Sequence, residues 1–203
     1  MPKAEHDKVD LYALHKAEYA APRQPALVET APALYLAVDG SGEPGSGEFE
    51  ARIGALYAMA YTIKFQSKSA GRDFTVCKLE ALWDAPVTPL APADSWRWTL
   101  MIRMPDFIAE KDLTEARRSL REKGKEGDFD AVGLLPLAEG TCVQALHVGP
   151  YEDEARTIER MRAFAASRDL ALHGRHHEIY LSDPRRVPPD RLRTILRHPV
   201  RPV

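Results

Sequence analysis

The spacing of hydrophobic positions along the chain predicts alternating strands and helices. Residues 33–40 (ALYLAVDG) form a short, continuous hydrophobic run of the kind found in buried strands. After a glycine-rich loop, residues 48–65 place hydrophobic side chains on one face at helical spacing. In residues 95–104, hydrophobic residues at every second position alternate with Arg97, Thr99, Met101 and Arg103, which predicts a strand with one buried and one exposed face. The first half of the chain therefore combines strands with one long amphipathic helix.

The same order of elements recurs in the second half of the chain. A strand at 73–83 completes the order strand, helix, strand, strand in the first half. The corresponding segments of the second half are a strand at 141–149, a helix at 150–167 and strands at 176–184 and 192–200. This internal duplication predicts an α+β fold of two tandem βαββ modules, related by a pseudo-two-fold axis and joined in one antiparallel sheet. We expect a ligand cleft at the seam between the modules.

The expected domain boundaries follow from this duplication. Prolines interrupt regular structure near the start of the chain, which we interpret as an arm with one short helix. The rest forms one domain, in which a polar connector helix separates the modules; Asp112 and Glu115 have the spacing of its capping box, and Gly124 ends it. The ranges are 1–31 for the arm, 32–203 for the domain, 32–105 for module one, 106–131 for the connector and 132–203 for module two.

Composition and charge exclude several classes of protein. Hydrophobic residues make up 44% and charged residues 29% of the 203 residues, as in ordinary globular proteins. The net charge of -2, with acids and bases interspersed, argues against a nucleic-acid-binding surface. No hydrophobic run is long enough to cross a bilayer and the N-terminus lacks a signal-peptide core, so we expect no membrane association and a cytoplasmic location. In that compartment Cys77 and Cys142 are expected to be buried thiols.

Two glutamates at equivalent places in the modules are the main candidates for function. Glu80 lies in KLEALW, three residues before Trp83, and Glu178 lies in HHEIYL, two residues before Tyr180. A buried carboxylate attracts an organic cation, and the neighbouring aromatic rings can stack on its flat ring system. With a raised pKa, the same carboxylate could act as a general base toward water. Because equivalent strands of the two modules would face each other, we expect both glutamates to converge on the cleft.

The alternation of side chains along a strand limits how Glu80 and Trp83 could both face the cleft. Glu80 and Trp83 fall on opposite faces of a regular strand, so a bulge or strand end near Trp83 is needed to direct both inward. His176, Glu178 and Tyr180 share one face without such help. The alternative interpretation is that each glutamate lies at the rim of the cleft or pairs with an arginine.

The predicted site contains further residues. We assign Glu80, Glu178 and Tyr180 to catalysis, and Trp83, Tyr61, Tyr151, His176 and Met101 to ligand binding. Tyr61 belongs to an aromatic stripe with Tyr57 and Phe65 beside the hydrophobic face of its helix, and ordinary core packing is the alternative. Tyr151 directly follows HVGP at the start of a helix, where simple packing is again the alternative.

Two motifs match the sequence patterns of known ligand sites, but their context argues against those sites. GSGEPG (40–45) has the spacing of a dinucleotide-binding loop, but Glu43 would repel a pyrophosphate and the following strands predict no parallel crossover. In HGRHHE (173–178), His173 and His177 have a spacing that suits zinc on a helix, not on a strand. We therefore expect no metal and no cofactor. The basic run 185–197 lacks the interleaved aromatic residues of an RNA site and is expected to be solvated or at a sheet edge.

Four segments together resemble a known family. They are ALYAMAYTIKF, KLEALW, HVGPYEDE (147–154) and EIYLSDPRRVPPDRLRTILRHPV (178–200). They resemble the GyrI-like small-molecule-binding proteins, relatives of the effector-binding domains of AraC-type and MerR-type regulators. With the N-terminal KVDLYALHKAEYAAP, the resemblance covers nearly the whole chain and is strongest to the stand-alone branch. That branch often has LEGLWW where this chain has Ala81 and Asp84, which implies a more polar and more open pocket wall.

The resemblance implies a fold and a function. The family has two βαββ modules around a cleft, and its ligands are flat, aromatic and often cationic. Some stand-alone members are hydrolases that open the strained cyclopropane of cytotoxic alkylating compounds. We therefore expect this chain to bind planar aromatic or cationic small molecules and, if it is an enzyme, to open activated cyclopropanes by water addition. The alternative is a ligand-sensing partner protein without catalysis that acts through a separate transcription regulator, since no helix-turn-helix is evident in this sequence.

Overall fold

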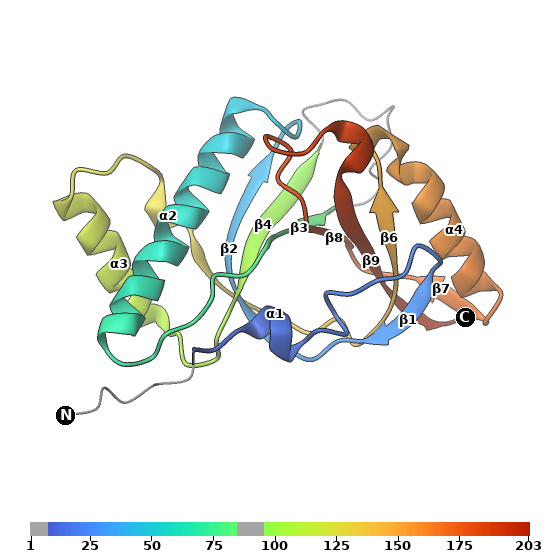
Figure 1. Ribbon diagram of the computed structural model, residues 1–203, viewed down its shortest axis with the longest axis horizontal. Helices are drawn as coiled ribbons and strands as arrows, with labels where there is room; N and C mark the ends of the chain where they lie inside the picture. Colours follow the sequence, from blue (N-terminus) through green and yellow to red (C-terminus); the bar gives the residue numbers. More distant parts are fainter. Residues whose placement is uncertain (1–7, 85–95) are drawn as a thin grey trace. The chain divides into compact units, whose positions relative to one another are not determined.

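The computed structural model describes residues 8–84 and 96–203, which form two compact units. Unit 1 contains residues 8–14, 33–77 and 96–137, and unit 2 contains residues 15–32, 78–84 and 138–203. Each unit thus combines segments that are distant in the sequence, as the colours of Figure 1 show. The proline-rich segment expected to separate two strands lies, after Asp84, outside the described residues.

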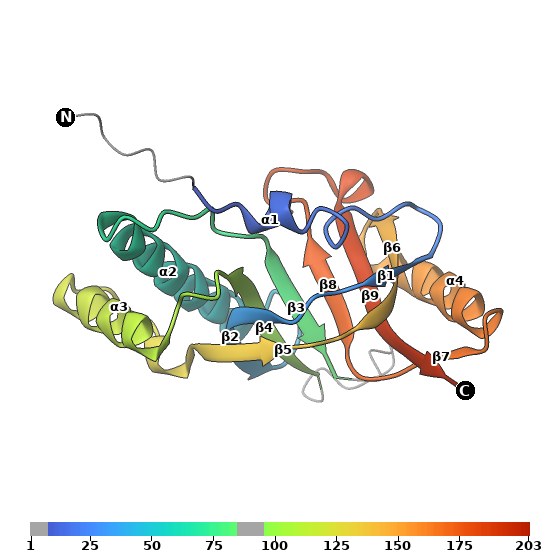
Figure 2. The same cartoon turned by 90° about the horizontal axis from the view of Figure 1, so that it is seen from below.

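Unit 1 is an antiparallel sheet covered by helices. β2 (Ala33–Ser41) pairs with β4 (Arg97–Met104) on one side and with β5 (Gly133–Leu137) on the other. α2 (Gly47–Ser69) packs on β2 and β4, and α3 (Glu110–Glu122) packs beside α2 (Figure 2). The unit also contains the short α1 (Leu11–Leu14) and a 3₁₀ turn, η2 (Phe129–Ala131).

A glycine near the end of β2 makes room for one tryptophan. A Cβ atom at Gly40 would lie 2.0 Å from the ring of Trp98, so only glycine fits there. The indole N–H of Trp98 donates to the carbonyl oxygen of Gly42 at 3.1 Å. Ser46 then caps α2, because its hydroxyl accepts a hydrogen bond from the N–H of Phe49. The packing of Trp98 therefore explains why residue 40 is a glycine, and no bound nucleotide is needed to explain it.

The connector helix α3 begins earlier than its sequence pattern predicts. Its first residue is Glu110, so Asp112 is the third residue of the helix. The Asp112 carboxylate accepts a hydrogen bond from the N–H of Ala109 at 2.8 Å, and the predicted capping box with Glu115 is therefore wrong. Gly124, with a φ of 65°, follows the helix end as predicted.

The strands of unit 2 are also antiparallel, and their order is β1, β6, β9, β8, β3. The bounds are Ala26–Glu29 for β1, Leu79–Trp83 for β3, Thr141–Val148 for β6, His176–Tyr180 for β8 and Arg193–Pro202 for β9. β7 (Leu170–Leu172) also pairs with β9. α4 (Glu154–Ala166) follows a 3₁₀ turn, η3 (Tyr151–Asp153), and a further turn, η4 (Pro189–Arg191), precedes β9.

The two faces of this sheet bury different groups. On one face, α4 lies against β6 (Figure 1) and packs on a hydrophobic cluster that includes Val143 and Ala145; we call it the helix face. On the other face, Tyr19 of the arm packs with Leu146 and Ile179; we call it the arm face. Because side chains alternate along a strand, successive residues of β6, β8 and β9 belong to opposite faces.

A buried network of charged side chains lies on the arm face. The ring of His177 is between two carboxylates, with Nε2 2.9 Å from Glu80 and Nδ1 2.9 Å from Glu139. The hydroxyl of Tyr19 donates to the other oxygen of Glu80 at 2.8 Å. Arg197 donates to Glu139 at 3.5 Å and also to a backbone carbonyl of the arm. The network therefore ties the arm to the sheet.

These contacts keep His177 positively charged. Burial lowers the pKa of the imidazole, but the carboxylates of Glu139 and Glu80 outweigh this effect and raise the pKa of His177 to about 9. Burial opposes ionisation of Glu139 in the same way, but His177 and Arg197 lower its pKa to about 2. Removing one member would leave a buried charge unpaired, which is strongly destabilising.

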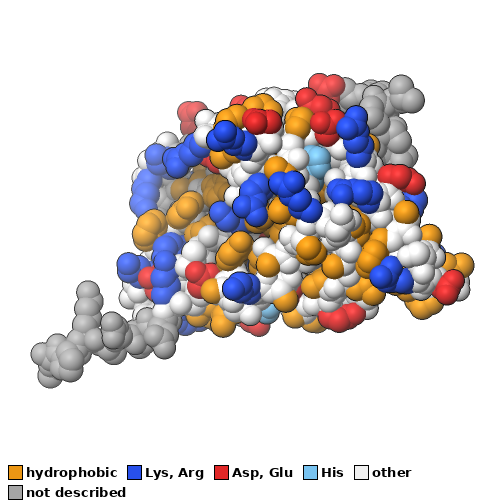
Figure 3. Space-filling model, turned by 45° about the vertical axis from the view of Figure 1, so that its right-hand side comes forward, with side chains coloured by type: hydrophobic (Ala, Val, Ile, Leu, Met, Phe, Trp, Pro, Cys, Tyr) orange, Lys and Arg blue, Asp and Glu red, His pale blue; other side chains and the backbone are white. Residues whose placement is uncertain are grey.

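The element order confirms the predicted α+β class with antiparallel βαββ repeats. The repeats are β2–α2–β3–β4 and β6–α4–β8–β9. Three strands, β1, β5 and β7, were not predicted. The module boundaries and the pseudo-two-fold relation stay predictions. Among the described residues, no helix has the length and hydropathy needed to cross a membrane. On the face drawn in Figure 3, acidic, basic and hydrophobic side chains are interspersed.

We predict that raising the pH from 7 to 9 destabilises the protein. The folded pKa of His177, about 9, lies above its ordinary value of 6.5. The stabilisation by protonated His177 is therefore complete below pH 6.5 and is lost as the pH rises through about 9. The free energy of unfolding, measured by urea titration at each pH, should fall by about 2 kcal/mol over this range.

The variant His177→Gln is the control for other groups that titrate in this range. It should be less stable than the wild type at pH 7, and its stability should change little between pH 7 and 9. If both proteins lose the same free energy over this range, the charged state assigned to His177 is wrong.

Candidate functional site

A second group of buried polar side chains lies on the helix face, beside the first turn of α4. Glu178 is at its centre and is 7% exposed. The hydroxyl of Tyr180 donates to Glu178 at 2.7 Å, and Nε2 of His176 lies 3.4 Å from the other carboxylate oxygen. Glu154, the first residue of α4, adds a second buried carboxyl group. We call Glu154, His176, Glu178 and Tyr180 the Glu178 cluster.

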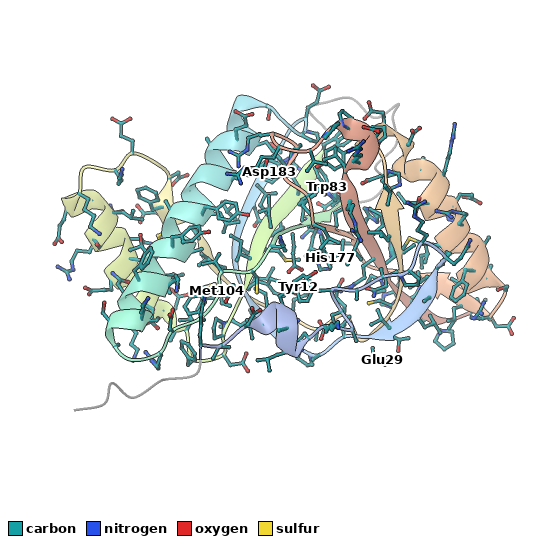
Figure 4. All side chains as sticks on the ribbon, viewed as in Figure 1. Tyr12, Glu29, Trp83, Met104, His177 and Asp183 are labelled. Atoms are coloured by element: carbon teal, nitrogen blue, oxygen red, sulfur yellow. The ribbon has the colours of Figure 1, made fainter. Side chains whose placement is uncertain are left out.

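The register between β3 and β8 brings Trp83 to this cluster. Trp83 lies opposite His176, and Ala81 lies opposite Glu178, so the side chains of these four residues share one face. Trp83 is buried and interacts with the Glu178 carboxylate. The pairing is regular from Glu80 to Trp83, so the bulge considered from the sequence is not formed there. Figure 4 labels Trp83 and His177, which the alternation along the strands places on opposite faces.

Glu80 lies on the opposite face from Glu178. It pairs with Ile179 across the strands, and its carboxylate contacts His177 and Tyr19 on the arm face. The strands β3 and β8 are equivalent in the two repeats and do pair, as the duplication predicts. The prediction that Glu80 and Glu178 converge is nevertheless wrong, because a regular register places the two carboxylates on different sides of the sheet.

The aromatic residues assigned to the site lie in different units. Tyr151 is in unit 2, is 38% exposed, and packs edge-to-face on Tyr180 with ring centroids 6.0 Å apart. Burial and the nearby carboxylates raise the pKa of Tyr151 to about 12, so its hydroxyl stays protonated. Tyr61 and Met101 are in unit 1; Tyr61 is 47% exposed and stacks between Tyr57 and Phe65, whereas Met101 is fully buried on β4. The ligand-binding role of Tyr61 and Met101 stays a prediction.

The two carboxyl groups of the Glu178 cluster have different proton affinities. Burial raises the pKa of Glu154, and the charge and hydrogen bond of Glu178 raise it further, well above its ordinary value. Burial also opposes ionisation of Glu178, but His176, Tyr180 and Trp83 outweigh it and lower the pKa of this carboxyl. These opposite shifts favour a protonated Glu154 beside an ionised Glu178. In such a pair, one group can donate a proton while the other accepts one.

Three buried polar atoms of the cluster make no hydrogen bond with the residues that the structure describes. They are Oε1 of Glu154 and both ring nitrogens of His176, although Nε2 is close to Glu178. Leaving buried polar atoms unsatisfied costs free energy, so these atoms are suited to contact another molecule. Glu154, His176 and Glu178 also offer ligand atoms within 4.8 Å of one another, a donor set that zinc accepts. The predicted absence of a metal stays a prediction.

Sequence reasoning missed Glu154. Glu154 ends the segment HVGPYEDE, and a carboxylate in the first turn of a helix is usually exposed and favoured by the helix dipole, so nothing local marks it as buried. Asp84 was expected to make a pocket wall polar. Its carboxylate lies 2.7 Å from Arg175, which also donates to the carbonyl oxygen of Leu82. The more polar and more open pocket wall stays a prediction.

Comparisons with known proteins agree on the family. The GyrI-like small molecule binding domain matches residues 127–201, the segment that carries Glu154, His176, Glu178 and Tyr180. A solved structure of a hydrolase from Listeria innocua is 37% identical, covers 96% of this chain and 100% of its own, and has a TM-score of 0.89. An uncharacterized conserved protein from the same organism gives the same four values.

A more distant structure has the same fold. The C-terminal domain of EcmrR is 12% identical, with a TM-score of 0.60 over 89% of this chain and 98% of that domain. No curated protein sequence matches the chain. The 37% identical relative is covered along its whole length, and the matched domain contains the Glu178 cluster. The chain therefore belongs to the GyrI-like family of small-molecule-binding proteins.

Proposed function

We propose that the Glu178 cluster binds flat, hydrophobic, cationic small molecules. The observation that carries this proposal is the buried Glu178 carboxylate between two aromatic side chains, Trp83 and Tyr180, whose contacts lower its pKa. Membership of a small-molecule-binding family supports it.

The charge of Glu178 favours a cation over a neutral ligand. The carboxylate is already removed from most of the solvent, so a cation that enters gains attraction without a further large cost of desolvating Glu178. A planar ring system can stack on Trp83, or on Tyr151, whose exposed ring lies at the edge of the cluster. The unsatisfied atoms of Glu154 and His176 can contact polar substituents of the ligand.

We further propose that the cluster opens electrophilic cyclopropanes by adding water. In a cyclopropane conjugated to a dienone, water attacks the less hindered ring carbon, a C–O bond forms, and the strained C–C bond breaks. The bonding electrons move to the dienone oxygen, which gives an aromatic phenol once it takes up a proton. The reaction is favourable because it relieves strain and restores aromaticity, so only moderate catalysis is needed.

We assign the roles in this step from the opposite pKa shifts of Glu154 and Glu178. Ionised Glu178 is the general base that takes a proton from the attacking water. Protonated Glu154 is the donor that stabilises and then protonates the dienone oxygen. Trp83 holds the flat substrate so that the ring carbon meets the water. Glu80 is fully buried on the arm face, so we assign it a positioning role through β3.

The binding proposal predicts a selective effect of Glu178→Gln. This variant keeps the shape of the side chain and removes its charge, so the affinity for rhodamine-like planar cations should fall by about 1.5–3 kcal/mol. Fluorescence titration measures the affinity, and a neutral planar dye should lose much less. Glu159→Gln, on the exposed side of the same helix α4, is the matched control and should bind as the wild type does.

Two results would contradict the binding proposal. One is that several planar cations show no saturable binding up to their solubility limits. The other is that Glu178→Gln weakens the binding of cationic and neutral dyes equally in a protein with wild-type unfolding behaviour.

The hydrolysis proposal predicts slow turnover of cyclopropane-bearing alkylators. The water adduct should appear by mass spectrometry, and Glu178→Gln should lower the rate by about 10²-fold or more. The rate should also fall as the pH rises through the raised pKa of Glu154, and Glu154→Gln should remove this alkaline limb. Glu80→Gln is the comparison on the other face: we expect it to reduce stability more than the rate per folded molecule.

The same experiment separates an enzyme from a sensor. If the wild type binds the alkylator saturably and returns it intact, the hydrolysis proposal fails and a ligand-sensing role remains. If Glu178→Gln binds the alkylator and opens the ring as fast as the wild type, the assignment of Glu178 as base is wrong.

A further inference from the structure

The arm face of unit 2 carries a hollow that the proposed function does not use. Its volume is about 410 Å³, and it is lined by Arg23, Leu146, Val148, Asp190, Arg191 and Arg193. All of these residues belong to unit 2. The volume lies in the range typical of small-molecule sites.

Three elements position the lining residues. Val148 of β6 lies directly opposite Arg193 of β9, so both side chains are on one face, and Leu146 is two residues before Val148 on the same face. Leu146 belongs to the hydrophobic cluster around Tyr19, which identifies the face as the arm face. The N–H of Leu146 donates to the carbonyl oxygen of Pro22 at 2.8 Å, which holds the neighbouring Arg23 beside β6.

The turn before β9 brings in the other charged residues. Asp190 and Arg191 belong to η4, which is followed by Leu192. The carbonyl oxygen of Leu192 accepts a hydrogen bond from Gly149 at 3.1 Å, and this contact fixes η4 beside the end of β6. The basic run that the sequence places at a sheet edge therefore contributes two arginines to one hollow.

The arginines of the hollow are not neutralised within the protein. None of Arg23, Arg191 and Arg193 forms an ion pair or side-chain hydrogen bond with another residue that the structure describes. Other arginines of the same unit do form such pairs, as Arg175 does with Asp84. With Asp190 as the acidic lining residue, the hollow has a formal charge of +2. Guanidinium groups gathered in this way favour a polyvalent anion, and their planar donors match phosphate oxygens in pairs.

We propose that this hollow binds a small phosphate monoester with a hydrophobic body. A phosphate monoester carries a charge of about -1.5 to -2 at neutral pH, which complements the +2 of the lining. Leu146 and Val148 provide a hydrophobic surface that inorganic phosphate alone would leave uncovered. The Glu178 cluster lies on the helix face, so the two sites are on opposite sides of the same sheet.

The test is isothermal titration calorimetry of the whole protein with 1-naphthyl phosphate. We expect saturable binding that weakens as salt is added, and weaker binding of inorganic phosphate and of 1-naphthol, because each supplies only one half of the interaction. Arg191→Gln and Arg193→Gln should each reduce the affinity about tenfold or more. Arg162→Gln, an exposed arginine on α4 that pairs with Glu159, is the matched control and should leave it unchanged.

A phosphate head group on a lipid offers the same chemistry, so a second arm uses vesicles. Phosphatidylcholine vesicles with and without phosphatidate are sedimented with the wild type and with Arg193→Gln. Binding of soluble 1-naphthyl phosphate without sedimentation on phosphatidate supports the proposal. Sedimentation that Arg193→Gln abolishes, with no binding of the soluble ester, would overturn it in favour of a membrane surface.

The phosphate-ester proposal and the proposed function of the Glu178 cluster can be contradicted separately. The phosphate-ester proposal is overturned if 1-naphthyl phosphate does not bind, or if both arginine variants bind it as the wild type does. Glu178→Gln should bind the phosphate ester normally while losing affinity for planar cations. If Glu178→Gln weakens phosphate binding as strongly as Arg193→Gln does, the assigned hollow is not the binding site.

Discussion

The antiparallel register between β3 and β8 is the constraint on which the candidate site depends. It places Trp83 opposite His176 and so assembles an aromatic wall next to Glu178. The same register directs Glu80 and His177 to the other face, where the arm covers them. A shift of one residue would exchange these sets and bury each charge among the wrong partners. The separation of the site from the supporting network therefore follows from one pairing of strands.

The two faces of this sheet bury charge by different means. On the arm face, His177 lies between two carboxylates and Arg197 adds a second cation, so opposite charges compensate one another. On the helix face, Glu154 and Glu178 are both acidic, and a retained proton compensates for their proximity. The first arrangement is satisfied by its own hydrogen bonds and stabilises the fold. The second leaves polar atoms without partners among the described residues, which is the property expected of a binding site.

The sequence predicts those features that depend on local periodicity. The pattern in 176–180 is sufficient to place His176, Glu178 and Tyr180 on one face, and the structure agrees. It is not sufficient to identify Glu154, because the burial of a residue at the start of α4 depends on how that helix packs. β4 shows the same limit: its alternation predicts one exposed face, but both faces are covered from residue 98 onward, including Thr99 and Arg103. Pairing between strands, likewise, cannot be read from either strand alone.

The central claim is that Glu178 is ionised while the adjacent Glu154 keeps its proton. Carbon-13 NMR of glutamate carboxyl groups across a pH titration tests it directly, with Glu154→Gln and Glu178→Gln to assign the two signals. The account predicts that Glu178 ionises below the ordinary value of 4.5, whereas the Glu154 signal is still that of a protonated acid well above it. If both carboxyl groups instead ionise together near pH 4.5, the account of the site is contradicted.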